Sequence, residues 1–322
     1  MRSSECHPFL RLAARTGILS DACRDLRDEL PVPNTSVPWD DLRAYLIALL
    51  VYPGLLTTAG LGLAAEMGAA WALVPERGGA ASAAAATLRA LRPARALPPL
   101  ALAAALLAMA AATQLAAPFN PVPPAQRNAL LAAVALIGTS WLTWSWGWGR
   151  RDTSPEVVLA VQACWLLAVL LPAIEPGNLR PQALGAVVLG PLVPLKIACG
   201  LLYVGCLPAL LMLLPEAAPQ GPPGSVVRGR VPEETGFTIV RALLWVPCCG
   251  LFTSLFFPSS DDVLGSVRFL LVTAGAAAVG IALTANLARR PAGITRTLYL
   301  RLALPFAGFA VLVAMLTNVL VH

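Results

Sequence analysis

The stretch LGSVRFLLVTAGAAAVGIALTANLARR, residues 264–290, decides how this chain folds. Its first part, residues 264–287, carries a single charge, Arg268. About 20 predominantly apolar residues suffice for a helix to cross a bilayer, so this stretch predicts a transmembrane helix. Arg289 and Arg290 follow directly. Because cytoplasmic loops retain Lys and Arg, this pair also predicts which end of the helix faces the cytoplasm.

Similar apolar stretches divide the rest of the chain after residue 43. The predicted spans cover residues 44–74, 97–117, 127–147, 156–174, 184–214, 237–257, 264–287 and 298–320. The first and fifth, at about 31 residues, must tilt, kink or project beyond the bilayer. Pro191, Pro194 and Pro208 favour a bend in the fifth. The predicted fold class is therefore all-α: a polytopic membrane protein of about eight transmembrane helices, with long tilted first and fifth helices.

The connections between these spans alternate between arginine-rich and arginine-poor. The first, third, fifth and seventh carry Arg77, Arg89, Arg92, Arg95, Arg150, Arg151, Arg228, Arg230, Arg241, Arg289, Arg290, Arg296 and Arg301. The second, fourth and sixth carry only Arg127, Arg180 and Arg268. This alternation predicts a multi-pass protein of the inner (cytoplasmic) membrane, with the arginine-rich loops cytoplasmic and both termini on the opposite side.

Composition supports a membrane protein and argues against other classes. The hydrophobic fraction is 57%, the mean hydropathy is +0.72 and only 12% of residues are charged, against about a quarter in soluble domains. The net charge of +6 comes from the inner loops, so it indicates topology and contact with anionic lipid rather than nucleic acid. The spans leave no room for a soluble catalytic domain, and we predict no catalytic residue.

The cysteines and histidines do not predict a metal site. Five of the seven cysteines lie in apolar spans, where a thiol packs as a small hydrophobic group: Cys164, Cys199, Cys206, Cys248 and Cys249. No CxxC pair occurs, and the two histidines stand at the chain ends. Haem, zinc and iron–sulfur centres need several His or Cys ligands. We therefore predict that this chain itself binds no metal and no cofactor.

The N-terminal segment, residues 1–43, differs from the rest. Residues 8–29 mix arginines and acids with apolar residues at helical spacing, which predicts an amphipathic helix on the membrane or on a partner. The proline-punctuated linker 31–41 follows. We thus divide the chain into an amphipathic and linker segment, residues 1–43, and a transmembrane domain, residues 44–322. Within the latter, the alanine-rich residues 80–96 predict an interfacial helix.

Two ionisable residues, Glu66 and Lys196, lie well within predicted spans. Each costs about 2.5–3.5 kcal/mol at a helix centre on insertion scales. Lys196 is the only lysine of the chain, and an ammonium can lose its proton when desolvated. One interpretation is a proton path or gate. The other is structural: Lys196 snorkels or pairs with a carboxylate, and Glu66 lies near the inner interface.

Four motifs, each beside an arginine-rich loop, carry a family resemblance. They are Glu66 with Glu76-Arg77-Gly78; Gly147-Trp148-Gly149 with Val161-Gln162; Leu214-Pro215-Glu216-Ala217 with Glu233-Glu234-Thr235-Gly236; and Arg289, Arg301 and Pro305. In these motifs and in its topology, the chain resembles the subunit 1 family of respiratory complex I. The resemblance includes the related membrane subunit of energy-converting nickel–iron hydrogenases. It departs from the family's acids at Leu167, Ser225 and Gly293.

The resemblance implies a membrane subunit that anchors a peripheral electron-transfer arm and contributes to a quinone cavity and proton path. The cavity, or its remnant, would lie between the first span, the 215–236 loop and the sixth span. Its candidate residues are Glu66, Arg77, Lys196, Glu216, Glu233 and Glu234. Arg150, Arg151, Arg289 and Arg301 would dock the arm. Quinone is the one possible ligand; the implied partners are antiporter-like membrane subunits and a peripheral iron–sulfur, quinone-site or hydrogenase arm.

Two other functions stay open. A stand-alone transporter or channel would use the kinked fifth span and the glycine-rich first span, although no inverted repeat, the usual sign of such transporters, is evident. A scaffold subunit that has lost coupling would explain the missing acids.

Overall fold

A computed structural model describes residues 39–73, 79–90, 99–147, 155–174, 176–186, 192–214, 233–258, 260–290 and 294–321. By spatial contact, the chain separates into residues 1–43 and 44–322. The amphipathic helix expected within residues 8–29 lies outside the described residues.

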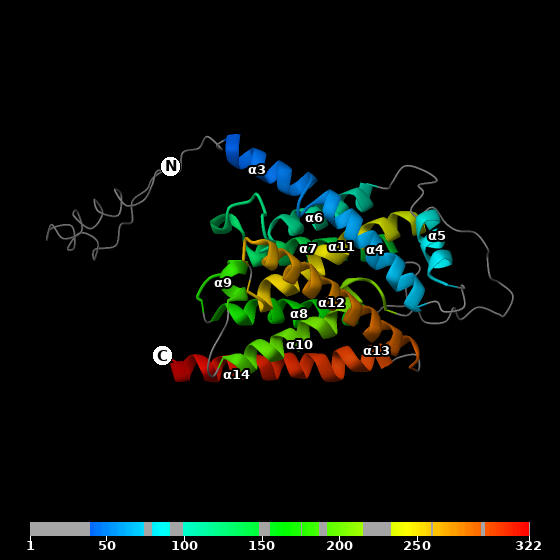
Figure 1. Cartoon of the computed structure of the whole chain (residues 1–322). Helices are drawn as coiled ribbons and strands as arrows, with labels where there is room; N and C mark the ends of the chain where they lie inside the picture. The colour runs from blue at the N-terminus through cyan, green and yellow to red at the C-terminus, as the bar shows by residue number, and fades with distance from the viewer. Residues whose placement is uncertain are drawn as a thin grey trace, which may run out of the picture. The chain divides into compact units, whose positions relative to one another are not determined.

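Helices make up all the regular structure in the described ranges (Figure 1). The α-helices are α3 (Trp39–Leu50), α4 (Leu55–Leu73), α5 (Ala80–Ala90), α6 (Pro99–Thr113), α7 (Ala129–Gly147), α8 (Pro155–Leu170), α9 (Pro181–Gly185), α10 (Val193–Leu210), α11 (Glu233–Phe256), α12 (Val263–Ala288), α13 (Ile294–Thr297) and α14 (Leu304–Val321). Two 3₁₀ helices, η3 (Pro124–Gln126) and η5 (Leu171–Ile174), and one π-helix, η6 (Leu298–Ala303), complete them.

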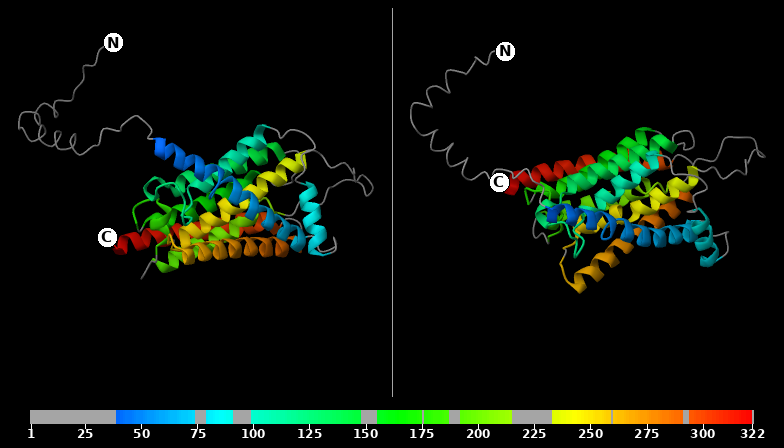
Figure 2. Two further views of the ribbon diagram at one scale, coloured as in Figure 1. Left: turned by 45° about the horizontal axis from the view of Figure 1, so that its top comes forward. Right: turned by 90° about the horizontal axis from the view of Figure 1, so that it is seen from above.

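These helices confirm the predicted all-α polytopic membrane fold. In the described part of the chain, 6 helical segments are long and apolar enough to cross a bilayer. Two shorter apolar helices, Pro99–Thr113 and Ala129–Ser145, occupy the second and third predicted spans. In Figures 1 and 2 the long helices run side by side, and α5 lies across the end where α4 ends and α11 begins. Helix α5 corresponds to the first part of the expected interfacial helix; residues 91–96 lie outside the described ranges.

The two long apolar stretches are each divided into shorter helices. In the first, α3 ends at Leu50 and α4 begins at Leu55. Pro53 has no N–H to continue a helix, and a Cβ on Gly54 would lie 1.9 Å from the Leu49 carbonyl oxygen, so only glycine fits this turn. In the fifth, the short α9 precedes α10, in which Pro194 occupies the first turn, where proline is tolerated.

Helix α11 is the centre of the fold. It packs against α4, α6, α7, α9, α10 and α12. In the apolar part of α11, 78% of the residues are buried, against 28% in α12. Helix α11 is therefore enclosed by protein, while much of the surface of α12 is exposed. The Tyr203 hydroxyl of α10 donates to the Cys248 carbonyl of α11 at 2.7 Å. Trp165 packs on the same tyrosine, with the two ring centroids 5.6 Å apart. Side chains on α11 are therefore held from several directions.

The five cysteines of the predicted spans are buried free thiols. The last span contains the π-helix η6, which ends just before Pro305. Proline lacks the N–H that would bond one turn back, and such a gap is a recognised cause of distortion in a helix. Tyr299 of η6 is buried, and its hydroxyl donates to the Gly205 carbonyl at 3.0 Å.

Candidate functional site

One face of α4 is buried. Its buried residues are Thr58, Gly62, Glu66 and Ala69. Positions three and four apart on a helix lie above one another, so these residues form a single stripe, and α4 packs extensively against α11. Glu66 is the one ionisable member of the stripe, and it is 2% exposed. The apolar sequence of the span thus delivers a carboxyl group to a helix interface.

Gly62 allows the two helices to approach closely. A Cβ placed on Gly62 would lie 1.8 Å from the carbonyl oxygen of Ala242 on α11. Any side chain there would push the backbones apart. Because Glu66 lies one turn further along α4, this close contact also determines how near its carboxylate comes to α11.

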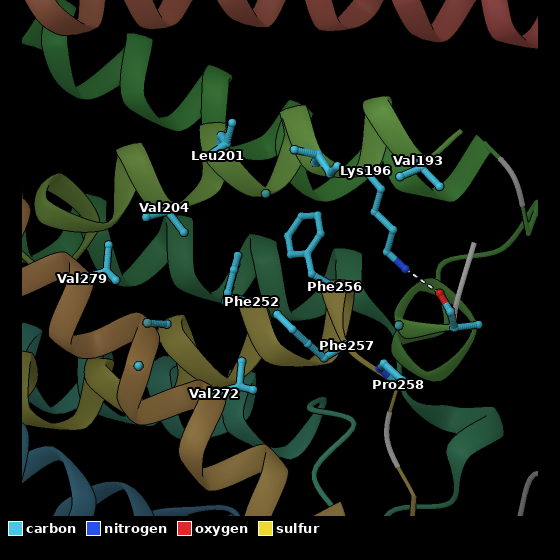
Figure 3. Close-up of a pocket in the computed structure, with 16 residues that line it drawn as sticks. Val193, Lys196, Leu201, Val204, Phe252, Phe256, Phe257, Pro258, Val272 and Val279 are labelled. Atoms are coloured by element: carbon cyan, nitrogen blue, oxygen red, sulfur yellow. Dashed lines mark hydrogen bonds between the residues drawn. The ribbon is translucent and has the colours of Figure 1, made fainter. Parts of the chain in front are cut away.

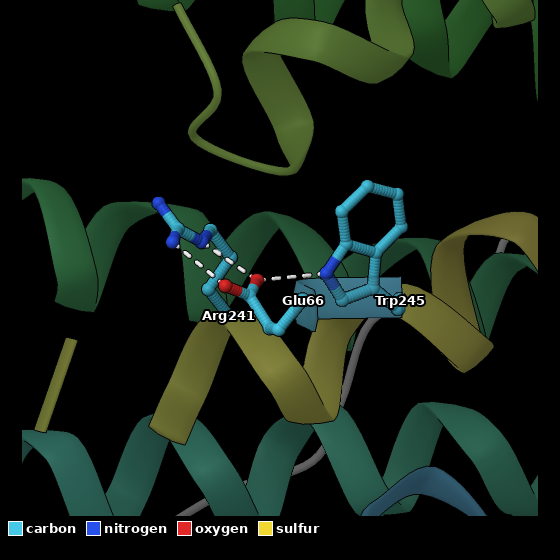
Figure 4. Close-up of polar contacts among 3 residues, drawn as sticks. All are labelled: Glu66, Arg241 and Trp245. Carbon is cyan, nitrogen blue, oxygen red and sulfur yellow. Dashed lines mark hydrogen bonds and ion pairs between the residues drawn. The ribbon is translucent and has the colours of Figure 1, made fainter. Parts of the chain in front are cut away.

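Two side chains of α11 bind the Glu66 carboxylate (Figure 4). The Arg241 guanidinium donates from Nε to Oε1 and from Nη2 to Oε2, both at 2.7 Å. The indole Nε1 of Trp245 donates to Oε1 at 2.8 Å. Arg241 and Trp245 are four residues apart, so they project from the same face of α11. The fork of two parallel bonds is the strongest arrangement of an arginine on a carboxylate.

Burial makes this pair consequential for stability and for chemistry. The side chain of Glu66 is 3% exposed and that of Arg241 is 25% exposed. Removing one partner from a buried ion pair typically costs about 3–5 kcal/mol, because the other charge is left uncompensated. Arg241 and Trp245 together supply donors to both oxygens of the Glu66 carboxylate at this buried interface. A displacement of the more exposed Arg241 would leave Glu66 with the Trp245 donor alone.

The predicted site residues are only partly brought together. Arg77 and Glu216 lie outside the described residues. Glu233 and Glu234 form the start of α11, two turns before Arg241, and nothing further is described of their side chains. Glu66 is bound instead by Arg241 and Trp245, which sequence reasoning did not select.

Assigning Arg241, Arg268 and Arg301 to connections was wrong. They lie within α11, α12 and η6, in the membrane-crossing segments Phe237–Phe256, Val263–Ala288 and Ile294–Leu316. A signal was available in the sequence. An arginine and a tryptophan four residues apart, inside a predicted span, mark a polar helix face that needs an acidic partner.

Lys196 has a different environment, on α10. Its ammonium donates to the backbone carbonyls of Leu184, at 2.8 Å, and Ala186, at 2.6 Å. These carbonyls belong to the end of α9, and a cation is favourable at a helix C-terminus. These two contacts hold the ammonium on the backbone at the end of α9.

The predicted docking arginines are incompletely described. Arg150 and Arg151 lie outside the described ranges. Arg289 caps the end of α12, and Arg301 is an exposed residue of η6. Near them, Arg296 forms an exposed ion pair with Glu156 at 2.8 Å, which joins α13 to α8. Exposed pairs contribute about 0–1 kcal/mol, so this contact orients the loop more than it stabilises the fold.

Arg127, from an arginine-poor connection, is a buried structural cation. Its guanidinium donates to the Val122 carbonyl at 2.8 Å and the Asn120 carbonyl at 3.0 Å, which closes the loop before α7. Burial lowers the pKa of Arg127 from its ordinary value, and nearby Asp261 acts in the opposite direction. Among the described residues, no group of three or more His, Cys, Asp or Glu side chains is placed to hold a metal ion.

Comparison with known proteins identifies the fold. No protein-family model matches the sequence, and no curated protein matches it. The structure is similar to a chain of the membrane-bound sulfane sulfur reductase, an archaeal respiratory membrane complex, with a TM-score of 0.58 and 14% identity. The match covers 86% of this chain and 99% of that chain. The chain therefore has the fold of a component of a respiratory membrane complex.

Proposed function

We propose that this chain is a membrane subunit of a respiratory redox complex related to complex I and to energy-converting hydrogenases. The observation that carries the proposal is the shared fold, because the match extends over 99% of the similar polypeptide of the sulfane sulfur reductase complex. A shared short helical motif would carry little weight; correspondence of an entire polytopic chain is more informative. The inner-loop motifs of the sequence support the same assignment independently.

In this role the chain anchors a peripheral electron-transfer arm. The arginine-rich side of the chain docks the arm through Arg289 and Arg301, which the structure describes, and through Arg150 and Arg151. A face rich in arginine favours a partner surface rich in carboxylates, since opposite charges steer association and fix its register. The arm supplies the redox centres, and other membrane subunits of antiporter type lie beside this one in the bilayer.

The Glu66–Arg241–Trp245 cluster is the proposed point at which redox chemistry reaches the membrane part. It joins the first and sixth spans, between which the family resemblance implies a quinone cavity or its remnant. A negative charge created by reduction near the start of α11 would attract the Arg241 guanidinium. Glu66 would then lose its fork of hydrogen bonds, and proton uptake by its carboxylate would compensate the buried charge. Lys196, held on carbonyls of α9, is not required for this step.

A second function, a scaffold that has lost coupling, is favoured by one specific observation. Glu66 accepts hydrogen bonds on both carboxylate oxygens, from Arg241 and Trp245. A carboxylate so well satisfied can serve as a static link between α4 and α11. The scaffold and the coupling subunit share partners and fold, and differ only in whether the pair responds to reduction.

Isolation of the assembly tests the proposal. The full chain, tagged at its C-terminus, is solubilised gently from its own membrane and its partners are identified by mass spectrometry. We expect subunits with iron–sulfur motifs together with other polytopic subunits. A tagged, unrelated polytopic protein from the same membrane serves as the control. Recovery of the chain alone, without a redox partner, would contradict the proposal and favour a stand-alone transporter.

A further inference from the structure

An apolar pocket of about 650 Å³ lies between α10, α11 and α12 (Figure 3). Its walls are Ile197 and Leu201 of α10, Phe252 and Phe256 of α11, and Val272 and Val279 of α12. Neither Glu66 nor its partners line it, so it is distinct from the site described above. Its volume lies within the range of about 300–1,000 Å³ that is typical of sites for small ligands.

One end of this pocket is cationic. Lys196 lines that end, with its ammonium on the carbonyl oxygens of Leu184 and Ala186, and Figure 3 shows Pro258 close to it. The Arg268 guanidinium donates to the carbonyl oxygen of Pro258. The Asp262 carboxylate lies near enough to Arg268 to interact with it. The rest of the lining is apolar.

We propose that the pocket binds an acyl chain of an anionic phospholipid, with the headgroup phosphate at the Lys196 end. The apolar walls can pack against the acyl chain, and lysine binds phosphate as a point charge. Ile197 and Leu201 are 58% and 64% exposed, so the pocket is open along α10 to the surrounding lipid. The proposal does not depend on the proposed redox function and can fail separately from it.

The size of the pocket favours a lipid chain over a helix of a partner subunit. A helix about 10 Å across and 5.4 Å per turn occupies about 400 Å³ per turn, so the pocket holds roughly one and a half turns. A helix that crosses the bilayer needs about 20 residues, more than five turns. A helix would therefore leave most of its length outside the pocket, and it would bring no phosphate to the cationic end.

Two glycines provide a matched pair of variants. A Cβ on Gly275, which lines the pocket, or on Gly308 of α14, which does not, meets no heavy atom within 4 Å. The full chain is purified in detergent, stripped of lipid, and titrated with phosphatidylglycerol, phosphatidylcholine or inorganic phosphate while its thermal unfolding is followed. Gly275→Leu fills the pocket, Gly308→Leu is the control, and Lys196→Met removes the charge.

We expect phosphatidylglycerol to raise the Tm of wild type and of Gly308→Leu, and inorganic phosphate to leave it unchanged. The affinity for phosphatidylglycerol should fall about tenfold or more in Gly275→Leu and in Lys196→Met. For Lys196→Met this is the size of one lost charged hydrogen bond. If Lys196→Met does not fold, Gly275→Leu alone decides. Equal affinity for phosphatidylcholine, full affinity in Gly275→Leu, or a partner helix photo-crosslinked to position 201 would each overturn the proposal.

Discussion

The two ionisable groups inside predicted spans, Glu66 and Lys196, are held in opposite ways. Glu66 on α4 is bound by two side chains of α11, one of them charged. Lys196 on α10 donates to two backbone carbonyls at the end of α9, those of Leu184 and Ala186. A side-chain ion pair has two states, because its partner can move away, whereas backbone carbonyls are tied to the fold. In the proposed function, the movable partner, Arg241, is therefore the group that responds to redox chemistry.

The largest effect is expected from breaking the Glu66 pair from one side. Arg241→Met leaves a buried carboxylate without its cation and should lower the free energy of unfolding by about 3–5 kcal/mol. The measurement is unfolding in mixed detergent micelles. In the double variant Glu66→Gln with Arg241→Met, no charge is buried and an oxygen remains for Trp245, so most of the loss should be recovered. A double variant as unstable as the single one would contradict this account.

The next effect tests whether close helix packing creates the site. Gly62→Ala places a Cβ against the Ala242 carbonyl and should destabilise by about 3 kcal/mol, the upper end for overpacking. Gly60→Ala, on the same helix with open space around its Cβ, should instead be neutral or slightly stabilising, because alanine favours a helix. Equal effects of the two substitutions in thermal unfolding would show that the close approach at Gly62 does not matter.

A smaller loss is expected on the other side of the comparison. Lys196→Met removes the two charged hydrogen bonds to the Leu184 and Ala186 carbonyls, so we expect about 2 kcal/mol. Lys196→Arg keeps donors and charge and should retain most of the stability. Measured by the same unfolding assay, a loss in Lys196→Met larger than that in Arg241→Met would reverse the proposed difference between the two groups.

The contribution of the indole is smaller again. Trp245→Phe removes only the Nε1 donor to Glu66 and keeps the aromatic ring in the core, so the expected loss is about 1.5 kcal/mol. A double-mutant cycle with Glu66→Gln measures the coupling between the two side chains. Strict additivity of the two substitutions would show that this hydrogen bond contributes nothing.

The smallest effect concerns an exposed carboxylate outside the spans. Asp262 caps α12, and its hydrogen bonds from Ser260 and the Gly265 amide hold its pKa below the usual 3.8. A carboxyl with a lowered pKa in the folded state contributes stability at higher pH, and this contribution is lost as the pH falls through its folded pKa. We expect a slight loss of Tm below about pH 4 that is absent in Asp262→Asn. An unchanged acid profile in that variant would rule out this contribution.

The sequence predicts the spans better than it predicts the site. Long apolar runs identify helices directly, and Glu66 is conspicuous as an acid within one of them. Its partner could not be read in the same way, because Arg241 is 175 residues away and its distance depends on the Gly62–Ala242 contact. Lys196 was equally conspicuous, but its contacts with the Leu184 and Ala186 carbonyls involve backbone atoms, which have no sequence signature. The break in the first span at Pro53 and Gly54 could have been predicted from these two residues but was not.

We propose that the Glu66–Arg241 pair links redox chemistry to proton movement. Its most direct test is proton translocation per electron in the isolated complex, reconstituted in vesicles, for wild type and for the double variant Glu66→Gln with Arg241→Met. The account predicts an assembled complex that still transfers electrons but translocates several-fold fewer protons. Full assembly with an unchanged proton-to-electron ratio would contradict it and would identify the pair as a static link within a scaffold.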